Sequence, residues 1–239
     1  MGITFDGNKD QQVNFNNMTQ EKITELLEWT YISTIRGLPG QTDIYSLVDD
    51  YLSRYDNETA INKLISAQKT KATTSGIITG FGGIITMPVT VPANVASVLL
   101  VQMRMIAAIA LIRGYDLNSD QVKTFIYATL AGTSVADITK KTGIIIGNKM
   151  MTGVIKKIPG KTLTKINQAV GFRLVTKFGT KGAINLGKAV PVAGAVVGGG
   201  IDFFTTTGIS KLAKRTFTDE GIDTGDGTII NKAEFEVID

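Results

Sequence analysis

The sequence predicts an all-α protein: a compact multi-helix bundle with glycine-rich, closely packed central helices, followed by an acidic C-terminal tail. Apolar residues recur at the three- and four-residue spacing of helices along much of the 239-residue chain. The 26 glycines and only 5 prolines suit helices that approach each other closely better than a loop-rich sandwich. No convincing set of segments alternates apolar and polar residues as strands do. Hydrophobic residues make up 43% of the chain, so a sizeable core can form.

Each predicted helix is marked by an apolar face and, in most cases, by a cap residue or a glycine at one end. In chain order they lie at about residues 23–31, 44–55, 57–65, 93–113, 118–130, 135–138, 163–170 and 190–217. The 44–55 helix has the clearest pattern and follows the cap residues Thr42 and Asp43. Asn57 is the expected cap of the next helix, and Gly114 is the expected left-handed cap after the 93–113 helix.

Composition divides the chain into a flexible N-terminal segment (1–17), a helical domain (18–217) and an acidic tail (218–239). The tail contains the turn-forming sequence TGDGT and is expected to be extended or mobile. Its likeness to a calcium-binding EF-hand loop fails because Thr228 stands where that loop requires glycine. Calcium binding is therefore not expected.

The 93–113 helix is about long enough to span a bilayer, but Gln102 and Arg104 lie near its middle. A central arginine costs roughly 2.5–3.5 kcal/mol in a membrane. We therefore expect a buried core helix in which Arg104 pairs with a carboxylate, because an unpaired buried charge is unfavourable. The candidate partners are Asp116, Asp120 and Asp202. The alternative is that Arg104 holds a lipid phosphate in a pocket.

Two pairs of glycines are spaced four residues apart on apolar segments, Gly76 with Gly80 and Gly194 with Gly198. Such spacing leaves one helix face without side chains, so that two helix backbones can touch. The pattern predicts close packing inside a bundle. The alternative is a membrane-permeabilising protein that deploys these glycine-rich helices.

The chain contains no Cys and no His, which excludes thiolate nucleophiles, disulfides, zinc–thiolate sites and Ser-His-Asp triads. The GFGG run at 80–83 lacks the spacing of a dinucleotide-binding loop, and we predict no cofactor and no metal site. An enzyme would have to use carboxylates, so this alternative depends on four aspartates. They are Asp116, Asp120, Asp137 and Asp202, and we assign none of them a catalytic role.

Charge is strongly segregated along the chain. Residues 1–60 have a net charge of −6, residues 218–239 also have −6, and residues 138–201 contain 11 basic residues and no Asp or Glu. This asymmetry indicates an anionic partner. Nucleic acid is not expected, because this stretch offers only Phe172 and Phe178 for stacking on bases. The candidate lipid- or anion-binding residues are Arg104, Lys156, Lys157, Lys161, Lys165, Arg173 and Lys177.

Several uncommon strings occur in order: GFGGIITMPVTVPANV (80–95), QMRMIAAIA (102–110), RGYDLNSDQV (113–122), GNK (147–149), KINQAVGFRLVTKFG (165–179), NLGKAVPVAG (185–194) and GGGID (198–202). Together they resemble the EcsC protein family over roughly residues 20–217, with the acidic tail outside the resemblance. The resemblance implies an intracellular, membrane-related protein that is accessory to an ABC transporter. It implies no reaction and no catalytic residues.

We therefore expect a cytoplasmic domain that associates peripherally with anionic membrane or binds a lipid. The polar N-terminus, MGITFDGNKD, does not resemble a secretory signal and agrees with a cytoplasmic location. Membrane permeabilisation and carboxylate-dependent catalysis are the two alternatives.

Overall fold

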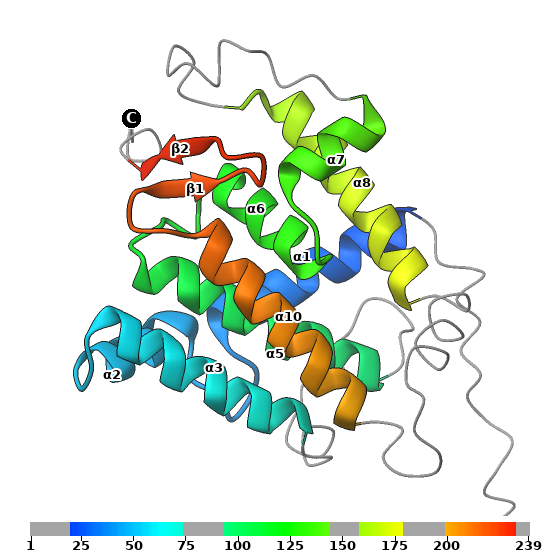
Figure 1. The fold of residues 1–239 in the computed structure, drawn as a ribbon. Helices are drawn as coiled ribbons and strands as arrows, with labels where there is room; N and C mark the ends of the chain where they lie inside the picture. Colours follow the sequence, from blue (N-terminus) through cyan, green and yellow to red (C-terminus); the bar gives the residue numbers. More distant parts are fainter. Residues whose placement is uncertain (1–19, 74–92, 144–157, 179–198, 233–239) are drawn as a thin grey trace, which may run out of the picture.

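The structure is a computed structural model that describes residues 20–73, 93–143, 158–178 and 199–232. Within these ranges the chain forms eight helices and one two-stranded antiparallel sheet (Figure 1). The predicted all-α fold is confirmed. The predicted close-packing glycines lie outside the described residues, as do two of the candidate lysines: Gly76, Gly80, Gly194, Gly198, Lys156 and Lys157.

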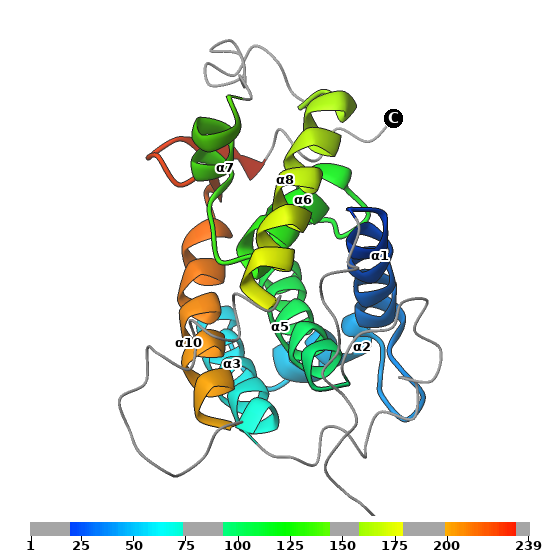
Figure 2. The same ribbon diagram turned by 90° about the vertical axis from the view of Figure 1, so that its right-hand side faces the viewer.

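Helix α5 (Ala93–Ile112) is the central element of the bundle. Every residue from 101 to 110 is buried, including Gln102 and Arg104. Five helices pack around it: α1 (Gln20–Arg36), α2 (Ile44–Leu52), α3 (Asn57–Thr73), α6 (Asp120–Leu130) and α10 (Gly199–Thr216). Figure 2 shows α5 running between α1 on one side and α3 with α10 on the other. The prediction of a buried core helix is confirmed. In the described part of the chain, no helix is long and apolar enough to cross a membrane.

Helices α2 and α3 both begin at a side-chain cap. The Asp43 carboxylate accepts hydrogen bonds from the Ser46 amide at 2.9 Å and from the Ser46 hydroxyl at 2.7 Å, as the cap prediction for α2 requires. At α3 the cap is Asp56 rather than the predicted Asn57, because the Asp56 carboxylate accepts from the Thr59 amide at 3.0 Å. Asn57 is instead the first residue of α3.

Helix α8 (Gly160–Phe178) packs on α1, α6 and the short helix α7 (Val135–Thr142). Its inner face consists of buried aliphatic residues at helical spacing: Leu163, Ile166, Val170 and Leu174. The approach to α8 is fixed by a buried hydrogen bond in which the Ile158 amide donates to Gln121 Oε1 at 3.1 Å. This packing fixes which face of α8 points outward.

The prediction of an extended or mobile tail is wrong for residues 218–232. Strand β1 (Gly221–Asp223) pairs with β2 (Ile229–Asn231), and the side chain of Ile222 is fully buried in the main core. The turn between the strands contains Gly225 and Gly227, whose φ angles of +99° and +93° are accessible mainly to glycine. The hairpin is therefore an integral part of the fold.

An ion-pair network ties this hairpin to the helices. Arg113, at the end of α5, is buried and contacts the carboxylates of Glu58 on α3 and Asp219 before β1. Lys214 of α10 adds a second contact to Glu58 at 2.9 Å. The hydrogen bond from Lys214, followed by that from Arg113, lowers the pKa of Glu58, so this carboxylate is held in its charged form. Two of the tail's acidic groups thus bind arginines of the helical domain: Asp219 binds the buried Arg113, and Asp223 binds the exposed Arg215.

Candidate functional site

The outward side of α8, here called the α8 outer face, combines positive charge with an exposed aromatic side chain. It consists of Lys161, Lys165, Gln168 and Phe172, which are all exposed. Their spacing of four, three and four residues places them on one face of the helix. Phe172 is 66% exposed, more than any other large hydrophobic side chain in the described ranges. The buried face of α8 lies opposite, so this exposure is a consequence of how α8 packs.

Two more exposed lysines lie on the neighbouring helix α7. Lys140 and Lys141 lie in the last turn of α7, and both are exposed. Helix α7 packs against α8, and the two helices lie together at the top of the molecule in both ribbon views (Figures 1 and 2). The sequence from 138 to 201 contains no acidic residue, so neither α8 nor the last turn of α7 carries a carboxylate that would neutralise these lysines.

Some exposed carboxylates lie at the opposite end of the bundle from α7. Asp49 and Asp50 of α2 are exposed, as are Asp56 and Glu58 where α3 begins. In both ribbon views α2 lies low in the molecule and α7 lies at its top (Figures 1 and 2). Other exposed carboxylates lie beside α7: Asp137 is on that helix, and Asp219, Glu220 and Asp226 are in the hairpin, whose Thr224 carbonyl accepts a hydrogen bond from the Ala136 amide. The basic surface is therefore local to α8 and the last turn of α7.

Arg173 of α8 does not belong to the exposed basic surface. Its Nε donates to the Ala131 carbonyl oxygen at 3.1 Å and its Nη2 donates to the Gly132 carbonyl oxygen at 3.3 Å. These carbonyls follow the last turn of α6, so Arg173 caps that helix. Of the remaining candidates, Lys177 lies on α8 with its side chain outside the described set, whereas Lys161 and Lys165 share the outer face.

Arg104 is also directed inward, but its partners differ from those predicted. The side chain is 8% exposed, and its Nη2 donates to the Thr42 carbonyl oxygen at 2.6 Å while its Nη1 reaches the Thr34 carbonyl at 3.4 Å. Among the residues with described side chains it pairs with no carboxylate, and the predicted partners Asp116 and Asp120 lie elsewhere. Burial lowers the pKa of Arg104, and the charge of Asp43 acts in the opposite direction.

Pairing with Asp116 or Asp120 is contradicted, because backbone carbonyls of α1 and of the loop that follows it accept the hydrogen bonds of Arg104. Asp202, the third predicted partner, has its side chain outside the described set.

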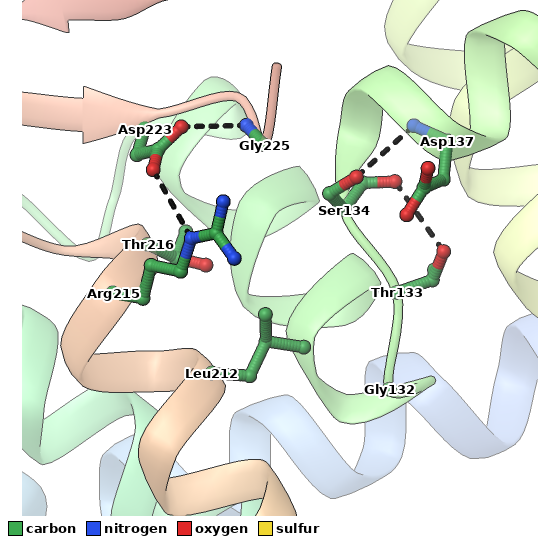
Figure 3. A pocket seen from close by; sticks show the side chains of 9 residues that line it. All are labelled: Gly132, Thr133, Ser134, Asp137, Leu212, Arg215, Thr216, Asp223 and Gly225. Atoms are coloured by element: carbon green, nitrogen blue, oxygen red, sulfur yellow. Dashed lines mark hydrogen bonds and ion pairs between the residues drawn. The ribbon is translucent and has the colours of Figure 1, made fainter. Parts of the chain in front are cut away.

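A polar pocket of about 130 Å³ lies between the start of α7, the end of α10 and the β1–β2 turn (Figure 3). It is lined by Gly132, Thr133, Ser134, Asp137, Leu212, Arg215, Thr216, Asp223 and Gly225. Arg215 Nε contacts the Asp223 carboxylate at 3.4 Å, and that carboxylate also accepts from the Gly225 amide at 2.7 Å. Across the pocket, the Ser134 hydroxyl oxygen accepts from the Asp137 amide at 3.0 Å and caps α7.

Of the aspartates with described side chains on which a carboxylate-dependent enzyme would rely, only Asp137 lines this pocket. Asp116 lies in the turn before α6, where it binds Asn118, and Asp120 is the first residue of α6. The second carboxylate in the pocket is Asp223, which was not among the predicted candidates because it lies in the segment expected to be mobile. The Asp223 carboxylate forms an ion pair with Arg215 of α10 and accepts a hydrogen bond from the Gly225 amide, so it stabilises the hairpin against α10.

The contact between the hairpin and α7 predicts a difference between two glycines. A Cβ on Gly225 would lie 2.2 Å from Ser134 Cβ, whereas a Cβ on Gly227 would meet nothing within 4 Å. Both residues have positive φ, so alanine at either position should cost about 1 kcal/mol in backbone strain. Gly225→Ala should cost roughly 1–3 kcal/mol more, because Ser134 or the hairpin must shift. Urea denaturation of both variants measures the difference, and equal losses would show that the hairpin does not rest on α7.

The chain matches the model of the EcsC protein family over residues 11–219. The match spans α1 to α10 and stops just before β1, in agreement with the extent of the resemblance noted in the sequence. Searches of curated proteins and of solved structures found no significant match.

Proposed function

The chain belongs to the EcsC protein family, and we propose that its α8 outer face docks the protein peripherally on an anionic membrane. The observation that carries this proposal is the exposed Phe172, which lies on the same helix face as Lys161 and Lys165. An aromatic ring flanked by lysines is the arrangement by which helices bind at a lipid headgroup layer. The lysines bind lipid phosphates while the ring enters the boundary between headgroups and acyl chains.

The expected strength of this docking is modest. A lysine close to an anionic surface contributes about 1 kcal/mol, and four of the lysines with described side chains on α7 and α8 are exposed. Partial burial of a phenylalanine adds about 1–2 kcal/mol. Binding of this size is reversible and depends on salt, because exposed charges are screened within about 8 Å at physiological ionic strength.

Binding to sedimented vesicles tests the proposal. The wild type should bind phosphatidylglycerol vesicles at low salt, bind them less as salt rises, and leave phosphatidylcholine vesicles unbound. Reversing both lysines, in the variant Lys161→Glu/Lys165→Glu, should weaken binding by at least ~30-fold, because about 2 kcal/mol of attraction is lost before any repulsion is counted. The matched control is Lys63→Glu/Lys211→Glu, which changes the net charge equally at exposed lysines of α3 and α10.

The control should bind nearly as well as the wild type if the α8 outer face is the contact surface. Equal weakening in both variants would mean that only net charge matters, and the proposed surface would then be wrong. Phe172→Ala separates the apolar contribution: it should weaken binding by about tenfold and leave the salt dependence unchanged. Far-ultraviolet circular dichroism checks that every variant keeps its helices, which we expect because all five side chains are exposed.

The other proposals concern events after docking. A membrane transporter as partner is implied by the family resemblance, and permeabilisation is implied by the glycine-rich segments, which lie outside the described residues. Dye leakage from the same phosphatidylglycerol vesicles distinguishes docking from permeabilisation, because docking alone predicts binding without leakage. Leakage that is lost in Gly198→Leu would favour the permeabilising alternative.

A further inference from the structure

A second cavity lies beside the guanidinium of Arg104, far smaller than the polar pocket near α7. Its volume is about 20 Å³, and its walls come from α1, α3, α5 and the loop that follows α1. It is lined by Ser33, Thr34, Gln41, Gln68, Leu100, Val101 and Arg104. The lining therefore contains one cation, four neutral polar residues that can donate hydrogen bonds, and no carboxylate.

The charge of Arg104 is not matched by a full negative charge in the described part of the chain. Its hydrogen-bond acceptors are the Thr34, Thr42 and Asp43 carbonyls and the Thr42 hydroxyl, which are dipoles. The Asp43 carboxylate acts on Arg104 at longer range, but its oxygens accept hydrogen bonds from Ser46. A buried guanidinium balanced only by dipoles retains affinity for an anion.

The buried hydroxyl group of Thr34, in the wall of the same cavity, is a second and independent indication of a ligand. Thr34 is 1% exposed, and its Oγ1 has no hydrogen-bond partner among the described residues. An unsatisfied buried hydroxyl costs about 1–3 kcal/mol, so such groups are normally partnered. The Thr34 side chain lines the Arg104 cavity, where it can donate a hydrogen bond to whatever the cavity holds.

We propose that this cavity binds a single small anion of the size of chloride, held by Arg104 and the Thr34 hydroxyl. A cavity of about 10–15 Å³ admits one water molecule, so 20 Å³ admits one atom-sized guest. A phosphate group has five heavy atoms and does not fit, which argues against Arg104 as the holder of a lipid phosphate. A water molecule would satisfy Thr34 but would leave the guanidinium charge unbalanced. The site lies on α5 and α1, so it does not rest on the proposed membrane docking.

Thermal unfolding of the full chain tests the proposal, with sodium chloride replacing sodium gluconate at constant ionic strength. A ligand that binds only the folded state lowers the apparent unfolding constant, by about tenfold for each tenfold rise in chloride above the dissociation constant. The wild type should show this dependence. Thr34→Val keeps the shape of the side chain and removes the hydroxyl, so its chloride dependence should be strongly reduced.

Thr124→Val is the matched control. Thr124 lies on α6 and is fully buried, and its Oγ1 also lacks a partner among the described residues, but it does not line the Arg104 cavity. This variant should keep the wild-type chloride dependence. Identical chloride responses in all three proteins would reflect a general salt effect and would overturn the proposal.

Bromide provides a direct readout, because crystals grown in sodium bromide should show an anomalous peak beside Arg104 and Thr34. An electron-density peak there without anomalous signal would identify water and equally reject the anion.

Discussion

Truncation of the chain after Phe217 is expected to lower the free energy of unfolding by about 5 kcal/mol, a large share of the 5–15 kcal/mol typical of a folded domain. The deletion removes Ile222, whose side chain is fully buried, and a loss of this kind alone costs about 2–5 kcal/mol. It also removes the Asp219 carboxylate that pairs with Arg113 and the Thr218 carbonyl that accepts from the Tyr115 hydroxyl at 2.8 Å. The melting temperature should fall by roughly 10–20 °C.

Two point variants separate packing of the hairpin from its charge. Ile222→Ala should cost about 2–5 kcal/mol, whereas Ile229→Ala should cost less than about 0.5 kcal/mol, because Ile229 is 42% exposed on the neighbouring strand. If the tail only screened the lysines electrostatically, truncation after Phe217 would strengthen vesicle binding and leave the melting temperature unchanged. That outcome would contradict a hairpin packed into the fold.

The helices could be predicted because their signals are local. The apolar spacing and the Asp43 cap of α2, the buried core character of α5 and the left-handed glycine after it all depend on residues within a few positions of each other. Helix α10 begins at Gly199 in the described residues, and the preceding part of the predicted 190–217 helix lies outside them. The inner face of α8 was indicated by its spacing, and the outer face with Phe172 is what remains exposed.

The hairpin, the hydrogen-bond partners of Arg104 and the inward direction of Arg173 were missed because their signals are not local. Each strand has only three residues, which is too short to show the alternation of apolar and polar residues that identifies a strand. Ile222 is buried because distant helices cover it, and its own neighbours are Gly and Asp. Arg104 and Arg173 bind backbone carbonyls, which every residue carries, so no residue pattern identifies these partners.

Arg104→Ala is expected to lower the free energy of unfolding by about 4 kcal/mol. Hydrogen bonds to a charged donor contribute about 1.5–3 kcal/mol each, and Arg104 makes them to the Thr42 and Thr34 carbonyls. The aliphatic stem of the arginine is lost from the core as well. Measurement in sodium gluconate removes any contribution of a bound halide, so that the loss reports the protein contacts alone.

Arg173→Ala is the matched comparison, because Arg173 also donates to two backbone carbonyls but is only half-buried on α8. Water can replace part of its contacts, so the loss of unfolding free energy should be at most half that of Arg104→Ala.

Neither variant should change binding to phosphatidylglycerol vesicles at temperatures where it is folded, since neither side chain belongs to the α8 outer face. If Arg104→Ala kept its stability but lost vesicle binding, Arg104 would be a lipid ligand, and its place between α5 and the α1–α2 loop would have to be reassigned. If both variants lost stability equally, burial would not be what distinguishes these two arginines.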